Sequence, residues 1–404
     1  MPRGGLEGFF RLREHGTDAR TEVLAGLTTF FVMSYIIAVN PSVLAAAGLD
    51  VRAVATSTCL VAGLLSIAMG LYTNRAFALA PGLGLNAIVA YNLVGTLGLT
   101  PAEAMGVVVA EGVLITVLVL LGVRKYVMDV VPAALSRAIA VGIGFFILFI
   151  GLRNAGVITF IPGQTGTVDG LLTLTPLNSW PIFVAMAGLA ITIVLVARGV
   201  PAAILAGILI ATVIAFLVPG DVARLPAEPF AGPDFSLVGQ FSFGFFAKLG
   251  LLTAVLTVIS FMLSDFFDTI GTLIGVGSEA GYLDDKGELT DSQRPLLIDS
   301  LGAVAGGALS ASSATTYIES AAGVAAGGRT GLVSVVTGIL FLLALPFVSL
   351  VGAIPAAATA PALIVVGVLM VVSAPASSAM SWSSWRAARV ARSILRSMSS
   401  PRYS

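Results

Sequence analysis

Charged residues are scarce in this chain of 404 residues: they make up 10% of it, against about 25% in soluble domains. An ordinary soluble protein is excluded, because its surface would need more polar side chains than this chain supplies. A disordered chain is excluded as well, because disorder goes with low hydrophobicity, and 57% of these residues are apolar.

Cysteine and histidine are almost missing, with Cys59 and His15 the only ones. No intrachain disulfide can form, and neither a multi-histidine metal site nor a Ser-His-Asp triad is expected. The 21 basic residues balance 21 acidic ones, so the charge does not favour a nucleic-acid partner. The chain also has no phosphate-loop or dinucleotide-binding motif. We therefore expect neither an enzyme nor a bound cofactor or metal.

Long apolar segments are what the chain has in abundance. A helix that crosses a hydrocarbon core of about 30 Å needs roughly 20 apolar residues, and about twelve segments are candidates. Three of them are too short or too interrupted to be simple spans, namely 77–96, 296–309 and 311–325. The candidates are 22–39, 54–71, 77–96, 101–121, 133–152, 181–197, 201–218, 247–264, 296–309, 311–325, 331–350 and 358–373.

Basic residues are distributed unevenly between the loops on the two sides of these spans. With the N-terminus in the cytoplasm, seventeen lysines and arginines fall inside and four fall outside. Cytoplasmic loops carry the excess of positive charge in membrane proteins. The sequence therefore predicts a multi-pass protein of the cytoplasmic membrane, with its N-terminus inside and an even number of crossings.

Two of the interrupted segments resemble each other. In 77–96 an extended stretch is broken by Pro81 to Gly84, and a helix then begins near Asn86. In 310–320 a run of small polar residues precedes a helix that begins near Glu319. Two broken spans at matching places are typical of inverted-repeat transporters, in which irregular backbone lines a binding site near the middle of the membrane.

Acidic residues inside the spans are candidates for function, because a charge in the membrane is costly. Glu103 follows Thr100-Pro101 and is expected to cap a helix, whereas Glu111 lies deeper. Asp265 and Asp268 are three residues apart, so they share one helix face and cannot both be comfortably ionised. That pair is suited to proton coupling; the alternative is that it caps a helix end. Glu319 is suited to a binding site; the alternative is that it only completes a capping box with Thr316.

Four stretches are similar to the adenine/guanine/hypoxanthine permeases of the nucleobase–cation and nucleobase–ascorbate transporter superfamily. The resemblance covers about residues 6–372 and its motifs are specific. The stretches are Gly16 to Glu22 (GTDARTE), Leu79 to Ala87 (LAPGLGLNA), Asp265 to Thr272 (DFFDTIGT) and Thr315 to Gly323 (TTYIESAAG).

The resemblance implies an all-α membrane fold of fourteen spans in two inverted repeats of seven, of which about twelve are present here. Spans three and ten would each contain a short strand and a half-helix. A core domain would hold the substrate, and a gate domain would supply most contacts of a homodimer. The implied parts are a cytoplasmic N-terminus (1–21), core (22–121), gate (122–218), outer loop (219–246), core (247–350), partial gate (351–372) and an atypical tail (373–404).

The resemblance further implies proton-coupled uptake of purine nucleobases such as hypoxanthine, adenine and guanine. The family's site corresponds to Asn86, Asp265, Asp268 and Glu319. Asn86, Asp265 and Glu319 would bind the base. Asp268 is the first choice for proton coupling, with Asp265 and Glu319 as the others. The partners would be the purine, a proton and the lipid bilayer.

The chain departs from the family after about residue 372, where a Ser/Arg-rich tail replaces the last two spans. A frameshift or premature end would produce such a tail, and a non-functional truncated permease is therefore one alternative. A second alternative is a sulfate- or bicarbonate-type anion transporter of the same architecture. Three carboxylates at the site, with no lysine or arginine beside them, argue against an anion.

Overall fold

The structure is a computed structural model that describes residues 5–122, 133–160, 172–176, 178–284 and 288–373. All but the first residue of the tail 373–404 therefore lies outside the described residues. The elements in chain order are α1 (Leu6–Phe9), α2 (Ala19–Met33), α3 (Ile36–Leu44), η1 (Ala45–Ala47), α4 (Val51–Thr73), β1 (Leu79–Pro81), α5 (Leu83–Ala87), η2 (Ile88–Thr96), α6 (Pro101–Leu120), α8 (Ala133–Asn154), β2 (Ile158–Phe160), β3 (Leu172–Leu174), α9 (Trp180–Ala197), α10 (Ala203–Leu217), α11 (Phe245–Leu249), α12 (Leu251–Ala280), α13 (Gln293–Ala308), β4 (Ala314–Thr316), α14 (Ser320–Ala325), α15 (Gly331–Leu343), η3 (Leu345–Ala353) and α16 (Ala356–Ser373).

The fold is mainly helical, and helices coincide with most of the predicted spans. Within the described residues, five helices are long and apolar enough to cross a membrane, and α15 with η3 is a pair bent by 64° that would count as a sixth if it is one span. Several other predicted spans are shorter apolar helices, such as α10. The total of twelve crossings and the seven-span repeat remain predictions.

Three boundaries differ from the sequence expectation. The segment 22–39 divides at Ser34, so that Tyr35 lies between α2 and α3. The span expected to end at residue 264 continues as α12 to Ala280, because its apolar face continues past the two aspartates. A second strand pair, β2 with β3, lies between the predicted spans 133–152 and 181–197, where only loop was expected.

Helices meet at glycines, where backbones approach closely as in other membrane bundles. A Cβ on Gly70 of α4 would lie 2.3 Å from the carbonyl oxygen of Gly331 on α15. The four-residue spacing of Gly271 with Gly275, and of Gly302 with Gly306, also predicts close helix packing. A Cβ on Gly271 would nevertheless meet nothing within 4 Å. Gly302 and Gly306 of α13 instead contact the backbone of the chain around β4.

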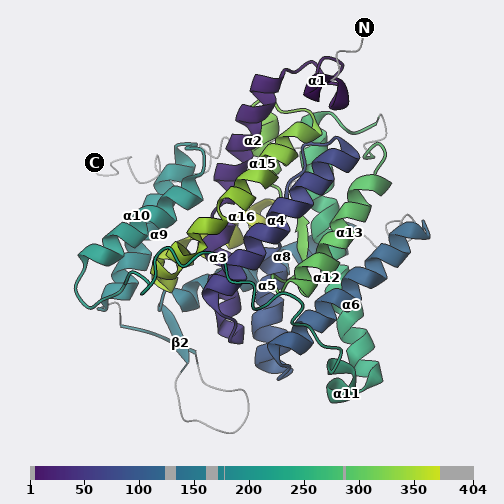
Figure 1. Ribbon diagram of the computed structural model, residues 1–404. Helices are drawn as coiled ribbons and strands as arrows, with labels where there is room; N and C mark the ends of the chain where they lie inside the picture. The colour runs from purple at the N-terminus through teal and green to yellow at the C-terminus, as the bar shows by residue number, and fades with distance from the viewer. Residues whose placement is uncertain (1–4, 123–132, 161–171, 177, 285–287, 374–404) are drawn as a thin grey trace, which may run out of the picture.

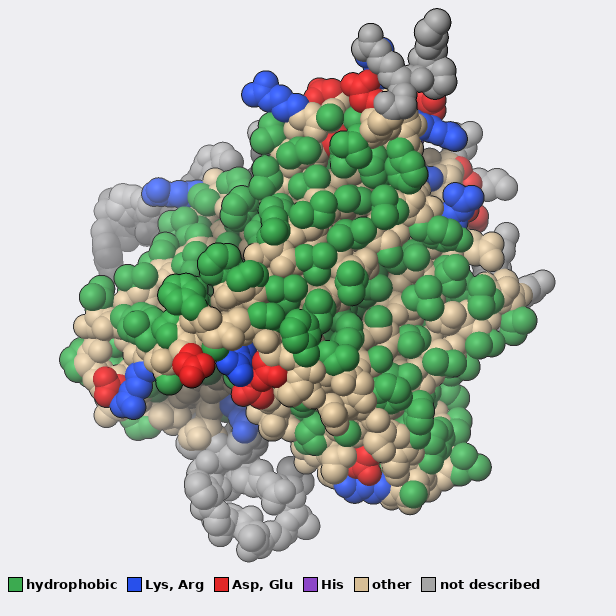
Figure 2. Space-filling model, in the orientation of Figure 1, with side chains coloured by type: hydrophobic (Ala, Val, Ile, Leu, Met, Phe, Trp, Pro, Cys, Tyr) green, Lys and Arg blue, Asp and Glu red, His purple; other side chains and the backbone are tan. Residues whose placement is uncertain are grey.

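The loops predicted on the two sides of the membrane collect at opposite ends of the bundle. At one end Arg75 donates to Thr290, and the amide of Arg329 donates to Glu22. At the other end Lys248 lies 3.5 Å from Glu103. Figure 2 shows apolar side chains over the middle of one face, with charged side chains toward its upper and lower margins. Such a band is the surface expected of a protein that spans a bilayer.

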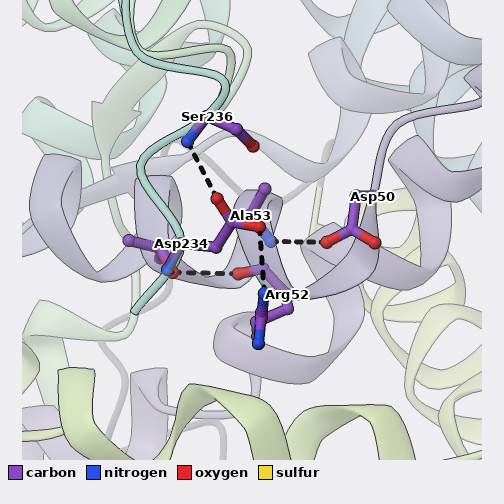
Figure 3. A network of polar contacts seen from close by, with 6 residues as sticks. Asp50, Arg52, Ala53, Asp234 and Ser236 are labelled. Carbon is purple, nitrogen blue, oxygen red and sulfur yellow. Dashed lines mark hydrogen bonds and ion pairs between the residues drawn. The ribbon is translucent and has the colours of Figure 1, made fainter. Parts of the chain in front are cut away.

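The loop 219–246, which the sequence predicts to lie outside, is fastened to the start of α4 (Figure 3). Asp234 accepts from the Ser236 amide at 2.9 Å and pairs with Arg52 at 3.3 Å. The amide of Asp234 donates to the Thr56 hydroxyl at 2.9 Å. The Ser236 amide holds the pKa of Asp234 below its ordinary value of 3.8, and Arg52 acts in the same direction. The folded protein therefore binds this proton less tightly than the unfolded chain does.

Asp234→Asn is expected to lower the stability of the purified protein slightly, by at most about 1 kcal/mol, because solvent screens a partly exposed pair. A lowered pKa contributes stability above the ordinary value, and this contribution is lost as the pH falls through the lowered pKa. The difference between wild type and variant should thus be present at neutral pH and vanish in acid. Thermal unfolding at several pH values measures it. Asp221→Asn, in an exposed pair with Arg224, is the control, and an equal effect there would refute the assignment.

Candidate functional site

The two broken segments pair with each other at the centre of the bundle. Strands β1 and β4 run antiparallel, with Ala80 opposite Thr315, and every residue of both strands is buried. The Gly82 amide donates to the Ser313 carbonyl at 2.9 Å. The short helix α5 follows β1, and α14 follows β4 after a short turn. The strand and half-helix predicted for each segment are thus present, and α5 and α14 leave from opposite ends of the strand pair.

Glu319 lies at the turn between β4 and α14 and is half-buried. Its carboxylate accepts a hydrogen bond of 2.5 Å from the Tyr35 hydroxyl, at the break between α2 and α3. The capping-box alternative is wrong: the Glu319 side chain makes no cap hydrogen bond. The Thr316 hydroxyl that would complete the box donates instead to Asp299 at 2.8 Å. The Glu319 side chain is therefore held by Tyr35 and does not cap α14, although the residue stands at the N-cap position.

Asp265 and Asp268 lie in the middle of α12, so the helix-end alternative for this pair is wrong. Asp265 is 2% exposed, and its Oδ2 accepts from the Ser313 hydroxyl at 2.8 Å. Asp268 is half-buried, and the charged groups that act on it most strongly are Asp299 and Glu319. One helix face thus presents one closed-off carboxyl and one accessible carboxyl.

Asn86 is fully buried on α5. Its amide nitrogen donates to the Asn40 side chain at 2.6 Å, and Asn40 in turn donates to the Thr58 hydroxyl at 2.8 Å. The side-chain oxygen of Asn86 has no hydrogen-bond partner among the described residues. Asn86 therefore fastens the half-helix α5 to α3, and its side-chain oxygen is buried and unpaired among the described residues.

Sequence reasoning missed Asp299, which is 5% exposed on α13. Its carboxylate accepts from the Thr269 hydroxyl at 2.6 Å and from the Thr316 amide at 2.8 Å. It therefore binds strand β4 to α12. Its place inside the apolar segment 296–309 was a signal that could have found it. Tyr35 and Asn40 carried no such signal, because polar side chains in spans are common.

Glu103 has the role the sequence predicts. Thr100 and Glu103 form a capping box at the start of α6, in which the Thr100 amide donates to the carboxylate at 2.8 Å. Glu111, two turns further along, is fully buried. The same helix thus carries one structural carboxylate at its end and one in the interior of the bundle.

Comparison with known proteins gives consistent results. A xanthine/uracil permease model, described as a permease family, matches residues 20–396, which reaches past residue 372, where the resemblance was expected to stop. The adenine permease AdeP of Escherichia coli (strain K12) is 41% identical, over 90% of this chain and 80% of the relative. The guanine/hypoxanthine permease PbuO of Bacillus subtilis (strain 168) is 37% identical, over 89% of this chain and 82% of the relative.

A solved structure extends the comparison to the fold. The transmembrane domain of the cyanobacterial bicarbonate transporter BicA superposes with a TM-score of 0.67, covering 93% of this chain and 95% of that one at 16% identity. At this identity the likeness concerns the fold alone. The matched relatives are transporters and not enzymes. By the family match and the identity to both permeases, the chain is a multi-pass membrane protein that belongs to the xanthine/uracil permease family.

Proposed function

We propose that this protein takes up purine nucleobases across the cytoplasmic membrane together with protons. The observation that carries the proposal is the Glu319 carboxylate. It is half-buried beside the paired strands β1 and β4, and it accepts a hydrogen bond from Tyr35. A purine base presents ring N–H donors, and a carboxylate accepts such donors with strong, charge-assisted hydrogen bonds. The likeness to the adenine permease AdeP and the guanine/hypoxanthine permease PbuO supports purines as the substrate class.

The roles of the site residues follow from their exposure. Glu319 and Asp268 are both half-buried, so we assign them to contact with the base. Asn86 is fully buried, and we keep it as a base-binding residue on its unpaired side-chain oxygen, not on exposure. Asp265 was expected to share in binding and coupling, but it is closed off behind Ser313. We therefore assign Asp265 to the proton. Asp268 acts on Asp265 directly, and Glu319 acts in turn on Asp268.

Transport itself requires the site to open to one side at a time. We propose that the bundle of α2–α6 with α12–α15 moves against α8–α10 with α16, as a core moves against a gate. In Figure 1, α9 and α10 lie at one edge of the molecule and α6, α12 and α13 at the other. The positive-inside distribution of basic residues supports a cytoplasmic N-terminus.

An anion substrate is the competing proposal, and the likeness to a bicarbonate transporter is the observation behind it. Glu319, Asp265 and Asp268 would repel an anion, and the site elements β1, α5, α12, β4 and α14 contain no lysine or arginine. Proteoliposomes with an imposed pH gradient separate the two. We expect accumulation of labelled adenine or hypoxanthine that excess sulfate or bicarbonate does not inhibit. Accumulation of the anion without purine uptake would contradict the proposal.

Tyr35→Phe is expected to weaken purine uptake about tenfold. The variant keeps the ring but removes the hydroxyl that orients Glu319, and a hydrogen bond to a charged group contributes about 1.5–3 kcal/mol. The apparent KM for uptake measures the loss. Tyr72→Phe, at the exposed end of α4, is the matched control and should leave the KM unchanged. A normal KM in Tyr35→Phe would remove Tyr35 from the site.

A further inference from the structure

Glu111 on α6 is a buried acid to which the proposed function gives no role. It is 0% exposed, and neither of its carboxylate oxygens has a hydrogen-bond partner within the part of the chain that the structure describes. The polar groups that act on it are the Asp265 carboxyl, the Ser313 hydroxyl and then Asp299. Its side chain therefore points at the acids behind the strand pair.

Asp265 offers a matching unpaired atom from the opposite helix. Its Oδ2 is occupied by the Ser313 hydroxyl, whereas its Oδ1 has no partner among the described residues and is buried. Two carboxyl groups, on α6 and α12, thus face each other with three unused oxygens between them. The hydroxyl beside both carboxyl groups is that of Ser313, which donates to Asp265.

The surroundings supply only negative charge. Asp299 and Asp268 also act on Asp265. Helices α6 and α12 and both strands contain no lysine or arginine, and Arg294 at the start of α13 pairs with Asp291 at 3.2 Å. Within the described residues, no group of three or more His, Cys, Asp or Glu is arranged to hold a metal ion. A compensating positive charge must therefore come from the smallest cation, the proton.

Close packing keeps water from compensating the charge. A Cβ on Gly112, the residue after Glu111, would lie 2.6 Å from the Val304 amide nitrogen on α13. A Cβ on Gly307 would lie 2.9 Å from the Val109 amide nitrogen on α6. Two ionised carboxylates in such a dry contact would repel each other and lose their hydration, so one of them must carry a proton.

We propose that Glu111 and Asp265 share one proton, and that this pair is the proton-binding site of the transporter. The proton sits on one carboxyl and is donated to the other, so that the pair carries a single negative charge. When the proton leaves, the second charge appears beside Ser313. This inference rests on the proposed function, because it identifies the site of the coupled proton.

The pair is connected to the substrate site through Ser313. The Ser313 hydroxyl donates to Asp265, and the Ser313 carbonyl accepts from the Gly82 amide, the residue between β1 and α5. A change of charge at the acid pair therefore acts directly on the backbone that joins the two broken segments. That path couples proton release to the position of α5 without contact between the proton and the base.

Glu111→Gln tests the proposal, because glutamine keeps the shape of the side chain but cannot release a proton. Infrared spectra of the purified protein without substrate are compared in neutral buffer. We expect a protonated-carboxyl band in the wild type that is lost in Glu111→Gln. Glu103→Gln, on the same helix but in the capping box, should keep the band. A band that is unchanged in Glu111→Gln, or absent from the wild type at neutral pH, would overturn the proposal.

A transport measurement gives a second, separate readout. In proteoliposomes, Glu111→Gln should still exchange labelled purine across the membrane. Its accumulation of purine against a gradient should be at least about tenfold lower than that of the wild type. Accumulation at the wild-type level would overturn the proposal. If the wild type moved no purine, the proposed function would fail, whereas the infrared result would still decide whether the pair holds a proton. If Glu111→Gln does not fold, two other measurements decide whether the pair holds a proton. The wild-type spectrum should show the band, and Glu111→Asp should keep both the band and the accumulation of purine.

Discussion

Replacing Glu319 by glutamine is expected to abolish purine uptake while leaving the protein folded. The variant keeps the volume of the side chain and an oxygen that can accept from Tyr35, but it removes the charge that binds the ring N–H of the base. Hydrogen bonds to charged groups contribute about 1.5–3 kcal/mol, and each 1.4 kcal/mol changes affinity tenfold. The affinity should fall by about 10- to 150-fold, which reduces uptake at low substrate concentration to background.

The control for this variant is Glu103→Gln. Glu103 is the same residue type in the same membrane, but it serves the capping box of α6 and a 3.5 Å pair with Lys248. Its replacement should lower thermal stability slightly and leave the KM for purines unchanged. Labelled uptake and binding to the purified variants distinguish the two positions. Unchanged uptake by Glu319→Gln would remove Glu319 from the substrate site.

Replacing Gly306 by alanine is expected to prevent formation of the folded protein. A Cβ there would lie 2.0 Å from the carbonyl oxygen of Ser312, and the contact is with backbone, which cannot rotate away. Overpacking of this kind costs about 1–3 kcal/mol even where side chains can yield. Helix α13 and strand β4 would have to separate, and the Asp299 hydrogen bonds to Thr316 would break with them.

Gly271→Ala on α12 is the matched control, because its Cβ would meet nothing within 4 Å. Alanine is favoured over glycine inside a helix by about 1 kcal/mol, so this variant should be as stable as the wild type or more so. The yield of monodisperse protein after extraction, and its thermal unfolding, measure both. A Gly306→Ala protein as stable as Gly271→Ala would refute the close contact.

Local sequence patterns were sufficient for much of this fold. The proline and the two glycines at 81–84 marked one break, and the small polar run at 310–320 marked the other, because such residues interrupt helices. Thr100 and Glu103 marked the start of α6 for the same reason. Each of these features is fixed by residues a few positions apart.

The features that sequence reasoning missed depend on distant residues. Tyr317 donates to the Pro81 carbonyl, 236 residues away, and no short-range pattern shows that β1 and β4 pair. The capping-box expectation for Glu319 failed because Asp299, on another helix, competes for the Thr316 hydroxyl. Asp265 and Asp268 were correctly placed on one helix face, but the different exposure of the two carboxyls depends on packing against α6, α13 and β4.

Uptake of labelled adenine and hypoxanthine tests the central claim most directly. The cells should lack their own purine permeases and express this chain of 404 residues, with and without an uncoupler. The account predicts accumulation of purine that the uncoupler abolishes and that Glu319→Gln does not show. Absence of uptake with the protein present in the membrane, or accumulation indifferent to the uncoupler, would contradict a proton-coupled purine carrier.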